Sequence, residues 1–305
     1  MEHFSSEDIA ELRNVYPARD AERSQSLFDR ERAEATTANT EAPIGVFDSG
    51  AGGLTILAAL RRELPYEHYI YFGDTAHCPY GARTDAEIIE LTSHACQFLL
   101  EQGVKLIVIA CNTASQAALT LMRATIPVPI IGVVPAVKPA ARATRRGRIG
   151  VATTNQAAQA FYLRQLIDEF AGGIKVFATG CPELVIIVEQ GELDGASVEE
   201  VVAHALHPLL QEDVDVIVLG CTHFPALRPL IERVAGPGVQ VIDSGAAIAR
   251  RLHSVLEAGA LIRRVTPHSA RRGELQLWCS GDPAVFSSVA GKILGYWVVA
   301  CQAIS

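Results

Sequence analysis

The chain of 305 residues, almost half of them hydrophobic, is long enough for two domains of ordinary size or one large one. Its net charge of −8 argues against nucleic acid or an anionic membrane as the main partner, because both attract clustered Lys and Arg. No apolar run reaches the roughly 18 residues of a membrane span, and the first twenty residues lack the features of a secretory signal, so we expect a cytoplasmic protein.

Residues 1–43 differ in composition from the rest of the chain. They hold ten acidic residues and five arginines, few apolar residues, and the threonine- and alanine-rich run "AEATTANTEAP". A segment of this kind buries too little apolar surface to offset the entropy that folding costs. We therefore predict a disordered N-terminal extension, with one short helix near Ser6–Asn14.

From Ile44 onward, short apolar strands alternate with helices. The predicted strands, in chain order, cover 44–49, 69–74, 105–111, 128–134, 148–154, 175–180, 215–221 and 239–244. The predicted helices cover 54–64, 84–103, 112–124, 159–171, 197–212 and 226–236. Thr84 is the predicted N-cap of the second helix, and the apolar tail "YWVVACQAIS" is expected to form an edge strand or a short buried helix. Apolar strands joined by crossover helices predict an α/β fold with parallel sheets.

The alternation of strands and helices also repeats itself. "IGVFDSG" from Ile44 resembles "IGVATTN" from Ile149, and "VKLIVIACNT" from Val104 resembles "VDVIVLGCTH" from Val214. The members of the two pairs are separated by nearly the same length of chain, which indicates two similar halves. We predict two pseudo-symmetric α/β domains, each a parallel sheet flanked by helices, with the active site in the cleft between them.

Two of the seven cysteines, Cys111 and Cys221, end equivalent strands of the two halves. Ligands of open α/β sheets bind beyond the carboxyl ends of the strands, and a following helix lowers the pKa of a thiol at its N-terminus. Either cysteine alone is best interpreted as a buried packing residue, but the equivalent pair favours a reactive site. Two facing thiols suit a two-base racemase or epimerase, in which one removes a proton from a carbon atom and the other supplies one.

Further polar residues follow other predicted strands. Asp48 precedes the turn "GAGG", whose backbone N–H groups are able to cradle an anion, although the turn matches nucleotide-binding loops poorly. The stretch "GDTAHCPYG" brings Asp74 and Tyr80 to a cleft, whereas Cys78 within it is expected to be structural. His223 is placed to assist proton transfer at Cys221.

No metal or cofactor is expected from these patterns. The cysteines have no C-x-x-C pair and no zinc spacing, and none of the four lysines lies beside the motifs, which weighs against a pyridoxal phosphate Schiff base. The chemistry would then depend on a paired acid and base, on tight positioning and on hydrogen bonds in a closed, water-poor cleft.

Six stretches together resemble the cofactor-independent glutamate racemases of the aspartate/glutamate racemase family. They are "FDSGAGGLTIL", "YFGDTAHCPYGAR", "ACNTAS", "GVVPAVKPA", "GCTHFPAL" and "SGDP", and the resemblance spans Ile44 to about Gly295. It implies the interconversion of L- and D-glutamate, which supplies D-glutamate for peptidoglycan in bacteria. The implied domains are 44–136 plus 250–305 and 137–249.

The resemblance also implies a role for each matched residue. The catalytic cysteines fall on Cys111 and Cys221, which Asp48 and His223 assist. The implied substrate contacts are Asp48, Ser49, Tyr80, Gly81, Asn112, Thr113, Thr222, His223 and Glu189. The implied substrate is glutamate, and the candidate partners are a second copy in a homodimer and, as in some bacterial members, an activating cell-wall precursor.

Two stretches depart from the family pattern. In "VATTNQAAQAFY", Ala157 takes the place of a usual hydroxyl residue, and "CPELVIIVEQG" carries Val-Ile-Ile-Val-Glu where Val-Pro-Leu-Val-Glu is commoner. Both departures concern the anchoring of the substrate rather than the class of reaction. Two alternatives stay open: a related racemase for another substrate such as aspartate, and a racemase-like protein that binds a ligand without catalysis.

Overall fold

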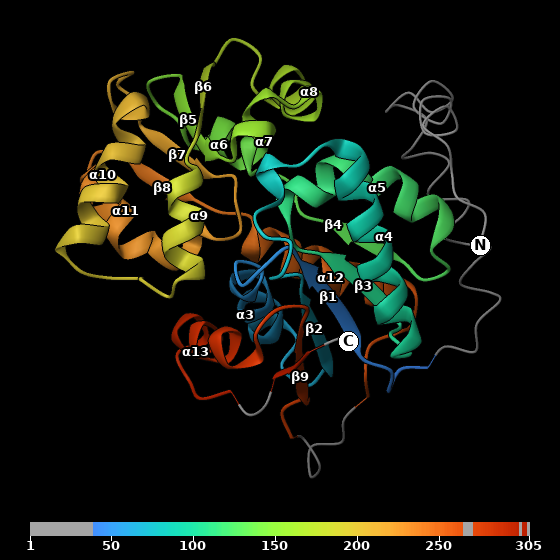
Figure 1. Cartoon of the computed structure of the whole chain (residues 1–305). Helices are drawn as coiled ribbons and strands as arrows, with labels where there is room; N and C mark the ends of the chain where they lie inside the picture. The colour runs from blue at the N-terminus through green and yellow to red at the C-terminus, as the bar shows by residue number, and fades with distance from the viewer. Residues whose placement is uncertain (1–38, 265–270, 299–300, 304–305) are drawn as a thin grey trace.

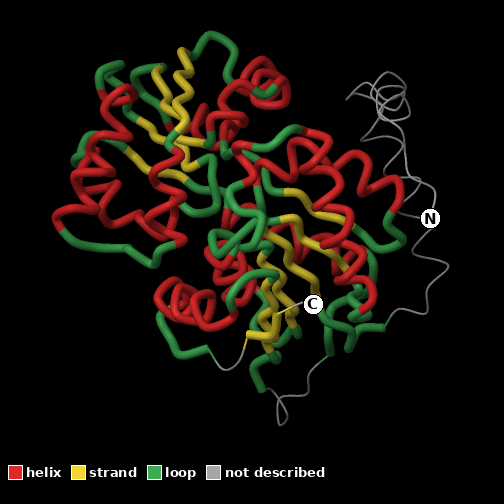
Figure 2. Tube along the Cα trace, viewed as in Figure 1, coloured by secondary structure: helices red, strands yellow, loops and turns green. Residues whose placement is uncertain are grey.

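The computed structural model describes residues 39–264, 271–298 and 301–303, which form two parallel β-sheets with helices packed on them (Figures 1 and 2). Most of the predicted extension, residues 1–38, and the predicted helix near Ser6–Asn14 lie outside the described residues. At the start of the described chain, Lys105 Nζ donates a hydrogen bond of 2.7 Å to Thr40 O. In the described parts of the chain, no helix is both long and apolar enough to cross a membrane.

The larger sheet has six strands in the order β10-β9-β2-β1-β3-β4. These strands are β1 (Ile44–Asp48), β2 (Tyr69–Gly73), β3 (Leu106–Ile109), β4 (Ile130–Gly132), β9 (Leu275–Cys279) and β10 (Cys301–Ala303). In register, Ile44 of the central strand β1 lies opposite Tyr69 on one side and Leu106 on the other. Every residue of β1 is buried, because helices cover both faces of a parallel sheet.

Five helices and a short 3₁₀ turn surround this sheet. They are α3 (Leu54–Glu63), α4 (Asp85–Glu101), α5 (Asn112–Thr125), α12 (Gly245–Ala258), α13 (Pro283–Leu294) and η1 (Tyr80–Ala82). Val46 of β1 packs in one core cluster with α3, α12 and α13, whereas the next residue, Phe47, packs in another with α4 and α5. This alternation follows from the two-residue period of side chains along a strand.

The smaller sheet has four strands in the order β6-β5-β7-β8. These are β5 (Arg148–Thr153), β6 (Lys175–Gly180), β7 (Val216–Leu219) and β8 (Gln240–Ile242). Its helices are α6 (Val137–Ala143), α7 (Asn155–Gln159), α8 (Phe161–Phe170), α9 (Pro182–Glu189), α10 (Ala196–Leu210) and α11 (Arg228–Ala235), with η2 (Phe224–Leu227) after β7. Ile149 of β5 lies opposite Val176 and Val216, as Ile44 does opposite its neighbours in the larger sheet. The strand order β2-β1-β3-β4 therefore recurs as β6-β5-β7-β8, as the sequence repeat predicts.

The predicted strands and helices all occur, with shifts of a few residues at their ends. Thr84 forms a complete capping box with Glu87 at the start of α4, which confirms the predicted N-cap. The periodicity of the sequence does not reveal α6, α7, α9, α12, α13 and β9. Of the two forms expected for the tail, residues 301–303 take that of an edge strand.

The pairing of strands in the two sheets can be compared with the predicted domains, although it does not define a domain boundary. Strands β9 and β10, from the C-terminal part of the chain, pair with the sheet that contains β1. The predicted boundary at residue 250 falls within the continuous helix α12, which packs against α3. The domain division stays a prediction, and α12 as a whole belongs with the larger sheet in packing.

Candidate active site

The carboxyl ends of strands from both sheets meet at one place. Thr222, after β7, donates a hydrogen bond of 3.0 Å from Oγ1 to Asp48 Oδ2 at the end of β1. Thr55 in α3 donates from Oγ1 to Thr222 O at 2.9 Å. Thr113, in the helix α5 that follows β3, and Thr154, directly after β5, lie 3.3 Å apart through their hydroxyl oxygens. Parallel sheets bind ligands at this end of their strands, so the contact region is where a substrate is expected.

A small cavity of about 20 Å³ lies in this contact region, with room for about one water molecule. Its lining contains Ser49, Pro79, Tyr80, Gly81, Cys111, Asn112, Thr113, Thr154, Val185, Cys221, Thr222 and His223. Nine of the eleven residues that the sequence singles out as a site are thus brought together around one space. The other two, Asp48 and Glu189, lie just behind the lining and bond to Thr222 and His223.

Cys111 is the N-cap of α5 and is almost fully buried. Its Sγ accepts a hydrogen bond of 3.4 Å from Ala114 N and lies 3.4 Å from Ser49 Oγ. Burial, followed by the negative charge of Asp48, raises the pKa of the Cys111 thiol to about 12. The helix N-terminus is expected to lower this pKa, but removal from water outweighs it in this structure.

Asp48 is a fully buried carboxylate at the end of β1. Its Oδ1 accepts a hydrogen bond of 2.9 Å from Gly50 N, and its Oδ2 accepts the bond from Thr222. Burial raises the pKa of Asp48, while the nearby His223 acts in the opposite direction. The side chain is therefore a buried acid that lies near the first cysteine and contacts the loop of the second.

Cys221, His223 and Glu189 form a chain of side chains on the other side of the cavity. Cys221 Sγ lies 3.6 Å from His223 Nδ1, and His223 Nε2 lies 2.5 Å from Glu189 Oε1. Cys221 is followed by the 3₁₀ turn η2 before α11 begins, so it does not cap an α-helix as Cys111 does. The predicted helix of residues 226–236 does follow Cys221, but only Cys111 lies directly at a helix N-terminus.

The imidazole of His223 is set to carry a positive charge. Burial acts to lower the pKa of His223, but its interactions with Cys221, Cys78 and Glu189 raise it well above the ordinary value. For Glu189, burial acts to raise the pKa, and the hydrogen bond from His223 more than offsets it, so that the pKa is lowered. Both shifts describe an ion pair buried behind Cys221.

The glycines of the "GAGG" turn make room for these acidic and basic groups. A Cβ on Gly50 would lie 2.2 Å from Glu189 Oε1, and a Cβ on Gly52 would lie 2.4 Å from His223 Nδ1. The turn does cradle an anion, as its N–H groups suggest, but the anions are the protein's own carboxylates. Ala51 N donates a hydrogen bond of 2.7 Å to Glu189 Oε1, and Gly50 N donates to Asp48.

Tyr80 lines the cavity with support from a buried carboxylate. Its hydroxyl donates a hydrogen bond of 2.6 Å to Asp74 Oδ2, and Ser280 Oγ donates one of 2.6 Å to Asp74 Oδ1. His77 Nδ1 lies 2.7 Å from Asp74 Oδ1. The contribution of Ser280 is not readable from the sequence, because 206 residues separate it from Asp74.

Two polar groups in the lining stand out for what they could bind. In the described chain, the buried Oδ1 of Asn112 has no hydrogen-bond partner, so it is free to accept one from a ligand. Thr154 is not among the predicted site residues, although the sequence repeat aligns it with Ser49. Ala157, where a hydroxyl is usual, lies outside the lining and donates through its backbone N to Thr154 Oγ1 at 3.3 Å.

Comparison with known proteins gives consistent matches over most of the chain. Residues 53–252 match the family described as Asp/Glu/Hydantoin racemase. The glutamate racemase of Herpetosiphon aurantiacus is 43% identical over 247 residues, which cover 81% of this chain and 96% of that protein. The glutamate racemase of Deinococcus radiodurans is 45% identical over 244 residues, which cover 79% and 83%.

Solved structures match as well. A glutamate racemase of Bacillus anthracis, isoform RacE1, superposes with a TM-score of 0.76 at 33% identity, covering 88% of this chain and 98% of that one. The Escherichia coli glutamate racemase, solved with L-glutamate and the activator UDP-MurNAc-Ala, has a TM-score of 0.76 at 32% identity, covering 87% and 98%. The chain therefore belongs to the Asp/Glu/hydantoin racemase family and shares the α/β fold of its glutamate racemase relatives.

Proposed function

We propose that the protein is a glutamate racemase that interconverts L- and D-glutamate by proton transfer at Cα between two cysteines. The observation that carries this proposal is the placement of Cys111 and Cys221, which follow the equivalent strands β3 and β7 and line the same cavity. Two relatives that are 43% and 45% identical over about four-fifths of the chain are glutamate racemases by name, which supports glutamate as the substrate. A single nucleophilic cysteine would leave the second one without a role.

In the proposed reaction, one cysteine acts as thiolate and the other as thiol. The thiolate removes the Cα proton on one face of glutamate, and the opposite thiol donates its proton to the other face. The products are the other enantiomer and a pair of cysteines whose protonation states are exchanged. Asp48 and His223, each beside one cysteine, would move protons to and from them between turnovers.

The substrate itself would help to ionise Cys111. The Asn112 oxygen without a partner in the described chain is suited to accept a hydrogen bond from the substrate ammonium group. A positive charge at that position would favour the thiolate of Cys111, whose pKa burial raises to about 12. The hydroxyl groups of Ser49, Thr113, Thr154 and Thr222 in the lining are donors for carboxylates.

Solvent deuterium exchange tests the proposal directly. The full chain should incorporate deuterium at Cα of both L- and D-glutamate, as followed by NMR, while racemisation is followed by circular dichroism. Exchange with aspartate alone would identify a racemase with another substrate, and no exchange with any amino acid would identify a binding protein. Either result would contradict glutamate racemisation.

The two-cysteine mechanism needs a separate experiment. Cys111→Ala and Cys221→Ala should each abolish racemisation, because each removes one of the two proton carriers. Cys96→Ala is the matched control, since Cys96 is also a buried free cysteine but lies in α4 outside the cavity lining. Full activity in either of the first two variants would contradict the mechanism.

The biological role and partners follow from the same proposal. D-glutamate made by this reaction would enter peptidoglycan synthesis. The Escherichia coli relative was solved with UDP-MurNAc-Ala as an activator, and activation of this chain by the same cell-wall precursor is tested by adding it to the assay. The proposed homodimer is tested by analytical ultracentrifugation of the full chain.

A further inference from the structure

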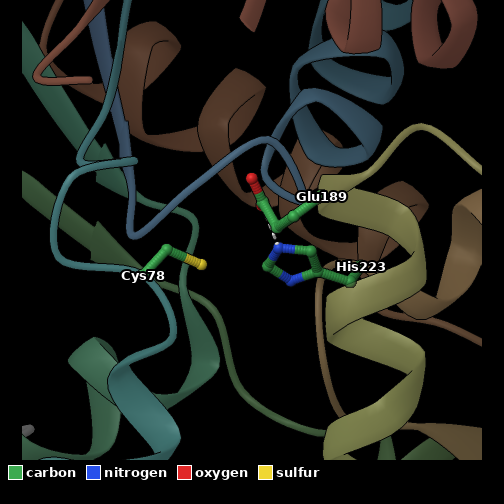
Figure 3. Close-up of side chains that lie close together, drawn as sticks. All are labelled: Cys78, Glu189 and His223. Atoms are coloured by element: carbon green, nitrogen blue, oxygen red, sulfur yellow. Dashed lines mark hydrogen bonds and ion pairs between the residues drawn. The ribbon is translucent and has the colours of Figure 1, made fainter. Parts of the chain in front are cut away.

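Three possible metal ligands from three separate segments of the chain lie close together, and one of them is His223. One ligand atom each from Cys78, Glu189 and His223 lies within 4.8 Å of the other two. Cys78 is in the loop between β2 and η1, Glu189 ends α9, and His223 follows β7. Figure 3 shows the sulfur of Cys78 and the carboxylate of Glu189 facing the imidazole of His223. In the described part of the chain, no other group of three such residues is close enough to hold a metal ion.

Glu189 lies on the far side of the imidazole from Cys221. The Nδ1 of His223 lies 3.6 Å from Cys221 Sγ, whereas its Nε2 lies 2.5 Å from Glu189 Oε1. A Cβ on Gly50 would lie 2.2 Å from Glu189 Oε1 and 3.0 Å from Cys78 Sγ, so both side chains lie beside the "GAGG" turn. His223 lines the cavity, but Cys78 and Glu189 do not.

Two members of the cluster are partly exposed to solvent. The side chain of Glu189 is 22% exposed and Cys78 is half-buried, whereas the His223 side chain is only 3% exposed. An ion would therefore approach Glu189 and Cys78 first and reach the His223 nitrogen last.

We propose that Cys78, Glu189 and His223 form an inhibitory binding site for Zn²⁺ or a similar transition-metal ion. Thiolate, imidazole and carboxylate are the three ligand types of zinc, and a water molecule would complete a tetrahedral set. One thiolate and one carboxylate balance the charge of a divalent ion beside a neutral imidazole. On binding, the Cys78 thiol proton and the proton shared by His223 and Glu189 pass to solvent.

Metal binding requires a change in the distance between Glu189 and His223. Metal bonds of about 2.0–2.2 Å to nitrogen and oxygen, at a tetrahedral angle, place those two atoms about 3.4 Å apart. Glu189 Oε1 would move about 1 Å away from His223 Nε2 compared with their present hydrogen bond. The same movement would disturb the hydrogen bond that Glu189 Oε1 accepts from Ala51 N, and the side chain that moves is partly exposed at the end of its helix.

Metal binding would stop His223 from exchanging protons. With Nε2 bound to the ion, the ring loses the proton that it shares with Glu189 and is held in one position. This inhibition rests on the proposed racemase function, but the binding site does not. Because the ion lies behind the imidazole, it should lower kcat for glutamate and leave KM almost unchanged.

Cobalt spectroscopy tests the site without any assay of activity. Under anaerobic conditions, one equivalent of Co²⁺ should give the full chain a thiolate-to-metal charge-transfer band and the intense visible bands of a tetrahedral site. Cys78→Ser should lose the charge-transfer band, whereas Cys221→Ala should keep it. Loss in Cys221→Ala and persistence in Cys78→Ser would overturn the proposal, since the metal would then be bound by the cysteine that lines the cavity.

Two further variants distinguish a loss of metal binding from a folding defect. Glu189→Gln keeps the side-chain shape and should weaken Co²⁺ binding at least about tenfold. His77→Gln is the matched control, because His77 is a histidine next to Cys78 that bonds to Asp74 instead, and it should bind Co²⁺ as the unaltered chain does. Equal affinity in Glu189→Gln and the unaltered chain would overturn the assignment.

X-ray absorption and kinetics complete the test. The Zn²⁺-loaded protein should show one sulfur and one imidazole ligand, and two sulfur ligands or none would contradict the site. Zn²⁺ should reduce racemisation noncompetitively with respect to glutamate, and competitive inhibition would place the ion in the cavity. If no racemase activity exists to be inhibited, the spectra still report the site, so the two proposals fail separately.

Discussion

The two cysteines occupy equivalent positions in the two sheets, yet their neighbours differ. Cys111 lies beside Ser49 and near Asp48, which both come from the end of the central strand β1. Cys221 lies beside His223, which is two residues further along its own loop. At the position equivalent to Asp48, the smaller sheet has Thr153, whose hydroxyl donates a hydrogen bond of 2.9 Å to Gly220 O.

The two halves therefore have thiols at equivalent positions but different polar side chains beside them. A buried carboxylate disfavours a second negative charge on Cys111, whereas the imidazole 3.6 Å from Cys221 is placed to exchange a proton with it. A two-base racemase needs one thiol and one thiolate at the start of each turnover. Two unlike halves meet that need more readily than two identical ones would.

The largest effects are expected from the two assistants, Asp48 and His223. Asp48→Asn and His223→Asn should each lower kcat/KM for racemisation by about 10²–10⁴-fold, the usual contribution of a positioned acid or base. The enantiomers have equal free energies, so kcat/KM must fall equally in both directions. The primary isotope effect should still differ, because each variant slows proton removal on only one face.

Glutamate deuterated at Cα makes this difference measurable. Asp48→Asn should show a large isotope effect with one enantiomer, and His223→Asn should show it with the other. This result would also identify the enantiomer that Cys111 serves. The same pattern in both variants would contradict the assignment of one assistant to each cysteine.

A steric test disturbs the same two residues without removing them. A Cβ at Gly52 would lie 2.4 Å from His223 Nδ1, and one at Gly53 would lie 2.5 Å from Asp48 Cβ. Gly52→Ala and Gly53→Ala should therefore each lower kcat about 10²-fold, as a displacement of about 1 Å does. Gly172→Ala is the control, because no atom lies within 4 Å of its Cβ position. Unchanged kinetics in Gly52→Ala would show that the position of His223 does not matter.

The sequence predicts much of this site, but not the contacts between its halves. The repeat locates Cys111 and Cys221, and the strand ends locate Asp48 and Thr222, because local periodicity carries that information. The role of Gly50 is not readable, since the carboxylate that fills the space above it belongs to Glu189, in a distant part of the chain.

The same limit explains what the sequence does not reveal in the fold and in the electrostatics. Strand β9 pairs with β2 although Leu275 and its partner Tyr69 lie far apart along the chain, and no local sequence pattern predicts such a pairing. The helix N-terminus that is visible in the sequence predicts a low pKa for Cys111. Burial and the nearby Asp48, which raise that pKa, enter only when the chain is folded.

The charge state of Cys111 can be tested by its reaction with iodoacetamide. Burial raises the pKa of this thiol to about 12, so it is protonated at neutral pH and its thiolate fraction grows tenfold per pH unit below that pKa. The alkylation rate of Cys111, followed by peptide mass spectrometry, should rise without a plateau from about pH 7 to about pH 10. Asp48→Asn should increase the rate at each pH, because the Asp48 charge is the next contributor to the raised pKa. A plateau below about pH 9 would contradict the raised pKa.

A smaller effect is expected from the hydroxyl that Thr154 brings to the cavity. Thr154→Val keeps the shape of the side chain but removes the partner of Thr113 and one donor for a carboxylate. One hydrogen bond is worth about 0.5–1.5 kcal/mol, so KM for glutamate should rise about 2- to 13-fold while kcat changes little. An unchanged KM would show that Thr154 does not contact the substrate.

The smallest effect is expected at Ala157, where the family usually has a hydroxyl residue. Ala157 is buried in α7 outside the cavity lining, and its backbone N already bonds to Thr154 Oγ1. A serine in a helix readily bonds a backbone carbonyl of its own helix, so Ala157→Ser should change kcat and KM less than about twofold. Steady-state assays of Ala157→Ser beside Thr154→Val would compare the two hydroxyl positions. An improvement in kcat or KM of more than about twofold in Ala157→Ser would show that the substrate reaches α7. Thr154 alone would then not replace the usual hydroxyl.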